Sequence, residues 1–322
     1  MNRITLDTFA RQAASWRKPY QAAYYAMYSS QWDGLTTDPL LMAVPIDDHL
    51  VHRGDGVFEA FKCVNGRLYN LEAHLTRLDD SAASIFLKCP IDHAALTRLI
   101  VETVRAGSQR DCTVRVFLSR GPGGFSVSPS QSPAPHLYIV SAKLGHPFMT
   151  DHPAGARVGS SRIPVKPAPF SSIKSCNYMP NVLMKHEAEI GGVDFTVSFD
   201  EADCLGEGAT ENAGIVTRDG RLLFPALDRI LKGTTMLRVA DLARALAGTG
   251  PLKQVAFEPI PRQAVRDAAE LMLVGTTIDV AAAIAFDGQP IGNGKPGPVA
   301  AQLNALLGRD VRENASLQTP VW

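Results

Sequence analysis

Residues 171–192 read Ser171-Ser-Ile-Lys174-Ser-Cys-Asn177-Tyr178-Met-Pro-Asn-Val-Leu-Met-Lys-His-Glu-Ala-Glu-Ile-Gly191-Gly192. Lys174 stands in an irregular segment just before a predicted helix, and the glycine pair marks the end of that helix. A lysine that is not on an exposed helix face can be held in a pocket, although a solvated surface lysine is the commoner case. The motifs that follow along the chain favour the pocket.

Two of these motifs have the chemistry of an anion site with an acid beside it. The first is a loop of small residues around Glu207, Leu205-Gly-Glu-Gly-Ala-Thr-Glu-Asn212. The second, Ile230-Leu-Lys-Gly-Thr-Thr235, opens a predicted helix, where free N–H groups bind anions, although Gly-Thr-Thr is equally a plain N-cap. A lysine for an imine, an acid for a ring nitrogen and a helix start for a phosphate are together what a pyridoxal phosphate site requires.

The composition is that of an ordinary soluble globular protein. The chain has 322 residues, of which 45% are hydrophobic and 20% are charged. Its 32 Lys and Arg balance its 32 Asp and Glu, so no net field attracts polyanions. We therefore expect neither nucleic acid nor a membrane surface as a partner.

Location and metal binding are also constrained by the sequence. No apolar run reaches the roughly 18 residues of a spanning helix, and the first twenty residues carry Asp7 and three arginines instead of a signal peptide's apolar stretch. The five cysteines are odd in number, widely spaced and never in a C-x-x-C pair. We expect a cytoplasmic protein with free thiols, no disulfide framework and no metal site.

Hydrophobic patterns predict a mixture of helices and strands, of α/β or α+β class. An Asn65-Gly66 turn signals a hairpin between its flanking strands, and apolar residues of 3.6 period mark a helix over 71–86. Further helices are expected over 92–106, 235–246 and 299–307. Strands are expected at 41–44, 57–62, 67–69, 113–119, 136–143, 195–199, 214–217, 222–224, 255–259, 270–274 and 280–285.

The composition changes at 145–153, where glycine and prolines gather, and we place a domain boundary there. The predicted organisation is an N-terminal extension (1–40), a small α/β domain (41–144), a linker (145–154) and a large domain (155–322). Four tyrosines of the extension, at 20, 24, 25 and 28, are spaced so that part of the set shares one helical face.

Several familiar catalytic and nucleotide-binding motifs are absent or incomplete in this sequence. His186-Glu187 lacks the second histidine of a zincin helix. Gly292-Asn-Gly-Lys-Pro-Gly297 matches G-x-G-x-x-G, but prolines interrupt it and only 25 residues follow, too few for a dinucleotide-binding unit. The chain has no P-loop motif and no G-x-S-x-G elbow.

With these motifs in hand, the sequence resembles the fold-type IV (class IV) pyridoxal-phosphate enzymes, which comprise branched-chain aminotransferases, D-amino-acid aminotransferases and aminodeoxychorismate lyases. The resemblance runs from about Val44 to Leu307. It is greatest to a plant-type D-amino-acid aminotransferase and lyase-like group, which shares Ala26-Met-Tyr-Ser-Ser30 and Pro129-Ser-Gln131. It rests on six ordered motifs, Arg53-Gly-Asp-Gly-Val-Phe-Glu59, His74-Leu-Thr-Arg-Leu-Asp-Asp-Ser-Ala82, Lys174-Ser-Cys-Asn-Tyr178, Glu207-Gly-Ala-Thr-Glu-Asn212, Leu231-Lys-Gly-Thr-Thr235 and Gly292-Asn-Gly-Lys-Pro-Gly-Pro298.

The resemblance implies a two-domain enzyme with pyridoxal 5'-phosphate in the cleft and a role for each matching residue. Lys174 would form the internal aldimine and then move a proton, for which it must be a neutral amine. Glu207 would keep the pyridine nitrogen protonated, and Tyr178 would hydrogen-bond the phenolate oxygen of the cofactor. The phosphate would lie against Arg77, the Thr234 and Thr235 amides and Thr276, while Thr210 and Gly233 complete the cofactor site.

The substrate prediction rests on one departure from the family. The loop that carries a carboxylate-binding arginine in relatives has Phe125-Ser-Val127 here. Arg115 occupies a strand position at which branched-chain enzymes also have arginine and lyases have lysine, so the resemblance makes it the candidate for the substrate carboxylate, with Phe58 and Thr277 as further substrate contacts. Alternation puts Thr113, Arg115 and Phe117 on one face of that strand, but does not decide which face is the pocket.

The implied activity is amino transfer between an amino acid, of D- or branched-chain type, and a 2-oxo acid by a ping-pong mechanism. An aminodeoxychorismate lyase that releases pyruvate and p-aminobenzoate is the alternative. A cofactor-dead binding protein would have lost Lys174 or Glu207, and both are present. The resemblance also implies a homodimer; substrate stereochemistry and amino acceptor stay open.

Overall fold

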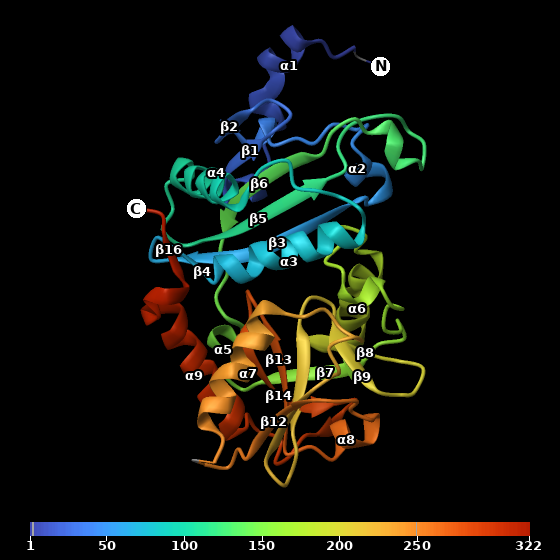
Figure 1. Cartoon of the computed structure of the whole chain (residues 1–322), viewed down its shortest axis with the longest axis vertical. Helices are drawn as coiled ribbons and strands as arrows, with labels where there is room; N and C mark the ends of the chain where they lie inside the picture. Colours follow the sequence, from blue (N-terminus) through green and yellow to red (C-terminus); the bar gives the residue numbers. More distant parts are fainter. Residues whose placement is uncertain (2, 249) are drawn as a thin grey trace.

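Two β-sheets, one above the other along the long axis of the molecule, form the frame of the protein (Figure 1). The computed structural model describes residues 1, 3–248 and 250–322. The first sheet has the strand order β16-β4-β3-β5-β6-β1-β2. Its strands are β1 (Tyr24–Ser29), β2 (Gly34–Thr36), β3 (Gly56–Val64), β4 (Arg67–Tyr69), β5 (Cys112–Ser119), β6 (His136–Lys143) and β16 (Gln318–Pro320).

The second sheet has the order β12-β11-β10-β13-β14-β7-β8-β9, with β15 paired to β14. Most of its neighbouring strands are antiparallel, while β7 runs parallel to both β14 and β8, and β11 runs parallel to β12. Its strands are β7 (Ala156–Ser160), β8 (Phe195–Phe199), β9 (Leu205–Gly208), β10 (Asn212–Val216), β11 (Arg221–Phe224), β12 (Gln254–Phe257), β13 (Glu270–Gly275), β14 (Asp279–Phe286) and β15 (Gln289–Pro290).

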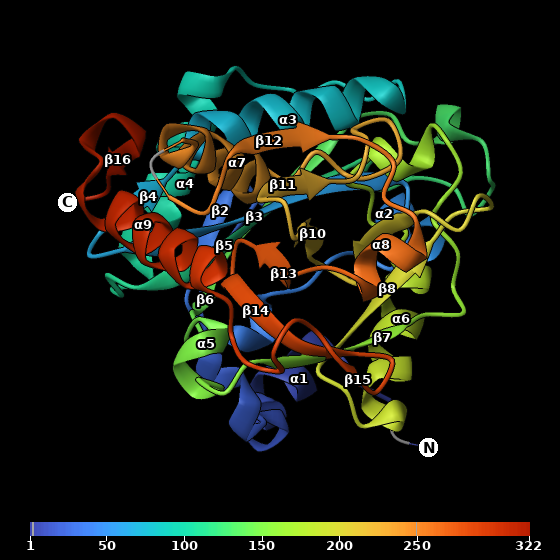
Figure 2. The same cartoon turned by 90° about the horizontal axis from the view of Figure 1, so that it is seen from below.

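The longer helices cover these sheets through their apolar faces. The α3 and α4 helices pack on one face of the first sheet, and α7 and α9 lie together along the second (Figure 2). None of the helices in the described part of the chain is long and apolar enough to cross a membrane. The helices are α1 (Leu6–Gln12), α2 (His49–Arg53), α3 (Leu71–Ser84), α4 (His93–Ala106), α5 (Phe148–Asp151), α6 (Met179–Gly191), α7 (Thr234–Leu246), α8 (Arg262–Arg266) and α9 (Pro298–Glu313).

The predicted hairpin and central helices are confirmed. Asn65 and Gly66 both have positive φ, of 53° and 75°, which is the geometry of the two-residue turn that joins β3 to β4. The apolar stripe of α3, including Leu71, Leu75 and Leu78, is buried, although the helix ends at Ser84, two residues before the predicted end.

Two predictions for the N-terminal part are wrong. Residues 24–36, assigned to an extension with a helical tyrosine face, form β1 and β2, and Met27 pairs with Val140 of β6. This pairing joins segments more than a hundred residues apart, so local periodicity does not reveal it. The predicted strand at 41–44 has no strand partner; its first residue ends a 3₁₀-helix (Pro39–Leu41).

In the second half, the predicted strands and helices are found within two residues of their expected bounds, except that α9 continues to Glu313, six residues beyond its predicted end. The elements β7, β9, β15, β16, α5 and α8 are additions. The chain passes from the first sheet to the second between the end of β6 and the start of β7. It returns at its end, because β16 pairs with β4. The domain boundaries themselves stay a prediction.

Candidate active site

Lys174 is placed by the free edge of β3. Because β4 pairs only with the end of β3, the first half of that edge is open to the segment around Lys174. The Phe58 amide donates to the Lys174 carbonyl oxygen at 3.0 Å, and the Cys176 amide donates to the Gly56 carbonyl oxygen at 2.9 Å. On the helix side, the Lys174 amide donates to Ser81 Oγ at 3.2 Å. The lysine is thus fixed by its backbone, without belonging to a helix or a strand.

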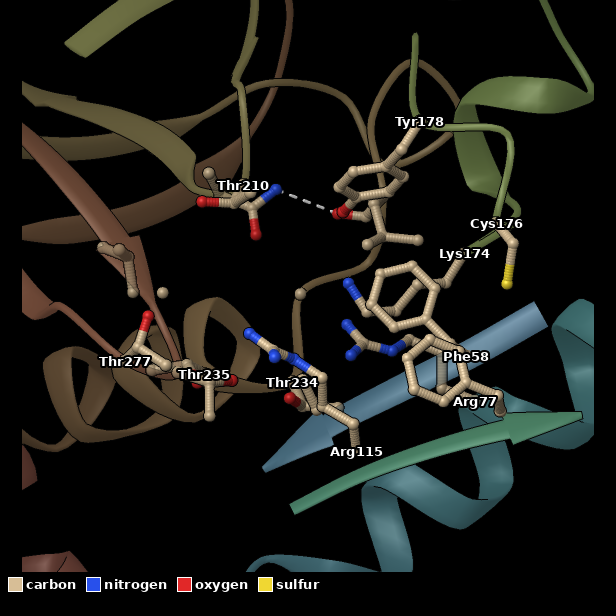
Figure 3. A pocket seen from close by; sticks show the side chains of 18 residues that line it. Phe58, Arg77, Arg115, Lys174, Cys176, Tyr178, Thr210, Thr234, Thr235 and Thr277 are labelled. Carbon is tan, nitrogen blue, oxygen red and sulfur yellow. Dashed lines mark hydrogen bonds between the residues drawn. The ribbon is translucent and has the colours of Figure 1, made fainter. Parts of the chain in front are cut away.

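The side chain of Lys174 enters a cavity of about 450 Å³ whose walls come from both sheets (Figure 3). Of the predicted site residues, all but Glu207 line this cavity; they are Phe58, Arg77, Arg115, Lys174, Tyr178, Thr210, Gly233, Thr234, Thr235, Thr276 and Thr277. Glu207 lines a smaller adjoining cavity together with Lys174, Tyr178 and Thr210. The fold therefore brings together residues from seven separate stretches of sequence.

The amino group of Lys174 has the lowered pKa that a catalytic base needs. Burial, followed by the nearby positive charge of Arg77, lowers the pKa of Lys174 to about 8. Its Nζ lies 4.6 Å from the centroid of the Phe58 ring. A substantial fraction of this amine is neutral close to physiological pH, which is what nucleophilic attack and proton transfer by a lysine need.

Arg77 is held rigidly by a carboxylate that the sequence analysis did not single out. Its Nε and Nη2 donate to Oε1 and Oε2 of Glu59, at 2.7 and 2.8 Å, and its Nη1 donates to the Lys232 carbonyl oxygen at 3.1 Å. Glu59 is fully buried. Burial alone would raise the pKa of Glu59, but Arg77 and His74 outweigh it and lower the pKa to about 2. Glu59 is thus an ionised anchor for Arg77.

His74 continues this network to the start of α7. Its Nδ1 lies 2.6 Å from Glu59 Oε2, and its Nε2 lies 3.1 Å from Thr234 Oγ1. Burial lowers the pKa of His74, which favours the neutral ring. Because ionised Glu59 only accepts, Nδ1 carries the proton, Nε2 accepts, and the Thr234 hydroxyl donates to it. Glu59 and His74 both stand inside motifs that define the family resemblance, which was the signal available for them.

The start of α7 has the donors of a phosphate site. Gly233 is the N-cap, so the amides of Thr234 and Thr235 begin a 13-residue helix whose first N–H groups lack partners within the helix. The hydroxyls of Thr235 and Thr276 lie 3.2 Å apart. A Cβ at Gly233 would come within 1.9 Å of Asn212 Oδ1, so only glycine fits this close approach.

Glu207 and Tyr178 both line the smaller cavity that adjoins Lys174. Glu207 Oε2 accepts from the Leu231 amide at 3.1 Å, and no other described residue than Asn212 donates to its carboxylate from a side chain. Burial raises the pKa of Glu207, with partial compensation by Lys166. Burial also raises the pKa of Tyr178, so its hydroxyl stays protonated and can donate.

Arg115 settles the open question of strand parity. It lines the cavity together with Phe117, so the face of β5 that carries Thr113, Arg115 and Phe117 is the pocket face. Figure 3 shows the cationic ends of Arg77, Arg115 and Lys174 directed into the same space. Within the described part of the chain, no hydrogen bond or ion pair engages the Arg115 guanidinium. It is an available cation on the cavity wall.

A comparison with protein families decides the assignment. The family model described as amino-transferase class IV matches residues 56–285, from the start of β3 to the end of β14. The chain belongs to the class IV aminotransferases. These enzymes use pyridoxal 5'-phosphate, and they transfer amino groups between amino acids and 2-oxo acids.

The aminotransferase has relatives of two named activities. It is 40% identical over 290 residues to the chloroplastic D-amino-acid transaminase of Arabidopsis thaliana, which covers 90% of this chain and 77% of that one. It is 27% identical over 271 residues to the D-alanine aminotransferase of Bacillus licheniformis, over 82% and 90% of the two chains. Its fold is that of the branched-chain amino acid aminotransferases of Escherichia coli, with a TM-score of 0.81, 21% identity and coverage of 92% and 99%. The branched-chain amino acid aminotransferase of Thermobaculum terrenum, solved in its pyridoxal phosphate form, has a TM-score of 0.80 and 20% identity, with coverage of 93% of this chain and 99% of that one.

The residues of the aminotransferase fit the cofactor. The helix start at Gly233, with Arg77 and Thr276 beside it, has the donors that a phosphate needs. Lys174, whose pKa is lowered, lines the same cavity, and the half-buried carboxylate of Glu207 lines the cavity that adjoins it. No part of this donor set conflicts with a bound pyridoxal phosphate.

Proposed function

We propose that the aminotransferase acts on monocarboxylic amino acids, with D-amino acids as the first class to test and branched-chain amino acids as the second. The observation that carries this proposal is the unengaged Arg115 guanidinium on the wall that faces Lys174. Among the described residues that line the cavity, Arg115 is the arginine whose guanidinium has no hydrogen-bond or ion-pair partner, and one such cation favours a substrate with a single carboxylate. The D-series is supported by the 40% identity to a D-amino-acid transaminase.

In this proposal Lys174 is the catalytic residue and accepts and returns a proton at Nζ. Pyridoxal phosphate, when bound, supplies an imine-forming aldehyde and a ring that withdraws electrons from the substrate Cα. Arg77, the Thr234 and Thr235 amides and Thr276 hold the phosphate, and Gly233 and Thr210 shape the site around it. Glu207 would keep a proton on the pyridine nitrogen of the cofactor. The Tyr178 hydroxyl would donate a hydrogen bond to the phenolate oxygen of the cofactor.

On the substrate side, Arg115 binds the carboxylate through two parallel hydrogen bonds, while Phe58 and Thr277 contact the rest of the substrate. Phe58 and Phe117 stack with ring centroids 5.8 Å apart, which provides an apolar surface for a side chain. A ping-pong cycle follows, because one cavity serves the amino donor and the oxo acceptor in turn.

We also propose a homodimer, two domains divided near 145–154 and a cytoplasmic location. The five free cysteines support a reducing compartment. Sedimentation of the loaded protein tests the dimer, since one species of twice 34.7 kDa is expected.

The experiment for the substrate proposal is a panel of half-reactions. The absorbance of the loaded enzyme is followed while D-amino acids, L-amino acids and primary amines are added separately, with no acceptor present. We expect a stoichiometric spectral change with D-amino acids that a 2-oxo acid reverses. Faster release of pyruvate and p-aminobenzoate from aminodeoxychorismate than any amino transfer would contradict the proposal and favour the lyase.

A further inference from the structure

A buried ion pair joins the two sheets beside the active-site cavity. Lys62 of β3 donates from Nζ to Asp279 Oδ1 at the start of β14, 217 residues away in sequence. Both residues are only 7% exposed. A buried ion pair is a poor net stabiliser, because the cost of removing two charges from water offsets most of their attraction. Its directional hydrogen bond, in contrast, fixes the relative position of the two segments that carry it.

On the first sheet, the pair continues the wall of the cavity. Side chains alternate along a strand, so Lys62 shares a face of β3 with Phe58 and Ala60, which both line the cavity. In the paired strand, Ala60 lies opposite Arg115 and Lys62 lies opposite Thr113. Lys62 is therefore the next residue along the same wall as the proposed carboxylate-binding arginine.

On the second sheet, the pair holds a turn that also lines the cavity. Asp279 pairs with Gly275 and closes the β13–β14 hairpin, whose turn presents Thr276 and Thr277 to the cavity. Asp279 has a φ of 57°, a left-handed backbone conformation that residues other than glycine adopt at some cost in free energy. The ion pair thus connects the phosphate side of the cavity to its substrate side at the point where the two walls meet.

We propose that Lys62 and Asp279 are positioning residues, which fix the Thr276–Thr277 turn relative to β3 and so set the width of the cavity between the phosphate and substrate positions. In addition, Asp279 neutralises Lys62, which leaves Arg115 as the available cation on that wall. This inference rests on the proposed site, in which Thr276 contacts the cofactor phosphate and Arg115 the substrate carboxylate.

The test uses Lys62→Met, Asp279→Asn and the double variant, since asparagine removes the charge and tolerates the left-handed conformation of this position. The double variant removes both charges, so we expect it to recover most of the thermal stability that each single variant loses. The dissociation constant of pyridoxal phosphate is measured by absorbance titration of the apoprotein, well below the unfolding temperature. We expect this constant to rise at least about tenfold in each single variant and also in the double variant. We also expect KM for the amino donor to rise by a larger factor than kcat falls.

The matched control is Asp310→Asn. Asp310 accepts from Tyr69 of the first sheet and lies on α9, so it also joins the two parts of the molecule, but outside the cavity. We expect this variant to lose stability and to keep the cofactor affinity. A folded double variant with wild-type affinity and KM would overturn the positioning role and leave the proposed function intact. A wild-type protein that takes up no pyridoxal phosphate would overturn the proposed function, and the inference with it.

Discussion

At the residue scale, Arg77 determines much of the chemistry of the cavity, because it acts on two neighbours at once. Its charge is the second cause, after burial, of the lowered pKa of Lys174. Its side chain is 11% exposed, and its guanidinium is oriented by fully buried Glu59. The family resemblance implies that Arg77 binds the phosphate, and the geometry adds that the orientation of its guanidinium depends on Glu59.

We expect Arg77→Leu to weaken pyridoxal phosphate binding by roughly one to two orders of magnitude, since a hydrogen bond between charged groups contributes about 1.5–3 kcal/mol. Pyridoxal, which lacks the phosphate, should bind both proteins with similar affinity. The measurement is equilibrium titration of each compound into the apoprotein. Arg98→Leu, on the exposed face of α4, is the control and should change nothing. Retention of the cofactor by Arg77→Leu through dialysis would place the phosphate elsewhere.

Arg115 offers a second test at this scale. We expect Arg115→Met to raise KM for amino acids by about tenfold or more, with a much smaller effect on kcat, because the contact is made in the ground state and the transition state alike. Primary amines without a carboxylate should react at the wild-type rate. Steady-state kinetics with a D-amino acid and its matching amine decide the matter. Unchanged amino-acid kinetics would exclude Arg115 from carboxylate binding.

The residues that the sequence could reveal are those with a motif of their own. Lys174, Glu207 and the Gly-Thr-Thr start of α7 were recognisable because their types and order already imply a chemistry. Glu59 and His74 were not assigned, because a buried carboxylate inside a strand has no meaning until Arg77 is known to lie beside it. The Lys62–Asp279 ion pair could not be predicted from the sequence for the same reason, since its two residues belong to different sheets.

At the scale of the element, the start of α7 is the feature on which cofactor binding most depends. Three of the predicted cofactor contacts, Gly233, Thr234 and Thr235, come from this one helix terminus. The Nδ2 of the Asn212 side chain donates to the Leu231 carbonyl oxygen at 2.9 Å and so holds the segment that leads into the helix.

We expect Gly233→Ala to destabilise the fold by about 1–3 kcal/mol, since the added methyl group would overlap Asn212 and shift this segment. Cofactor affinity should fall as well. Gly145→Ala is the matched control, because a Cβ there would meet no atom within 4 Å. Chemical denaturation and cofactor titration of both variants give the comparison. Equal stability of the two variants would mean that the close approach at Gly233 is not required.

Elements were predictable where local signals sufficed. The hairpin at Asn65-Gly66 and the amphipathic α3 and α4 depend on turn chemistry and short-range periodicity. The β1 strand was missed because its tyrosine-rich sequence also suits a helix, and only the distant β6 selects the strand. β16 was missed because a three-residue strand at the chain end has too little pattern to recognise.

At the scale of the whole molecule, the two sheets are joined by contacts that are polar as well as apolar. Tyr69 of β4 and Arg238 of α7 both donate to Asp310 of α9, with Arg238 Nε at 2.8 Å. Burial alone would raise the pKa of Asp310, but the hydrogen bonds from Arg238, Tyr69 and Asn314 lower it below 3.8. The cavity lies between the parts that such contacts hold together.

We expect Asp310→Asn to lose about 1–3 kcal/mol of unfolding free energy at pH 7, the contribution of hydrogen bonds to a charged group. A carboxyl with a lowered pKa in the folded state stabilises the fold above its unfolded pKa, and this stabilisation is lost as pH falls through the folded value. The difference between variant and wild type should therefore be constant above about pH 5 and shrink below pH 3.8. Urea denaturation across this pH range measures it; a difference that does not depend on pH would contradict the ionised network.

The central claim is that Lys174 carries the cofactor, and reduction of the loaded enzyme with borohydride tests it most directly. Reduction makes the bond between lysine and cofactor permanent, and peptide mapping then locates it. The lowered pKa of Lys174, about 8, adds that cofactor uptake by the apoprotein should accelerate as pH rises through 8, because only the neutral amine reacts. Lys174→Ala should bind pyridoxal phosphate but form no imine that borohydride can reduce. Lys185→Ala should behave as wild type. The account predicts the label on Lys174 alone; a label on Lys166 or Lys185 would contradict it.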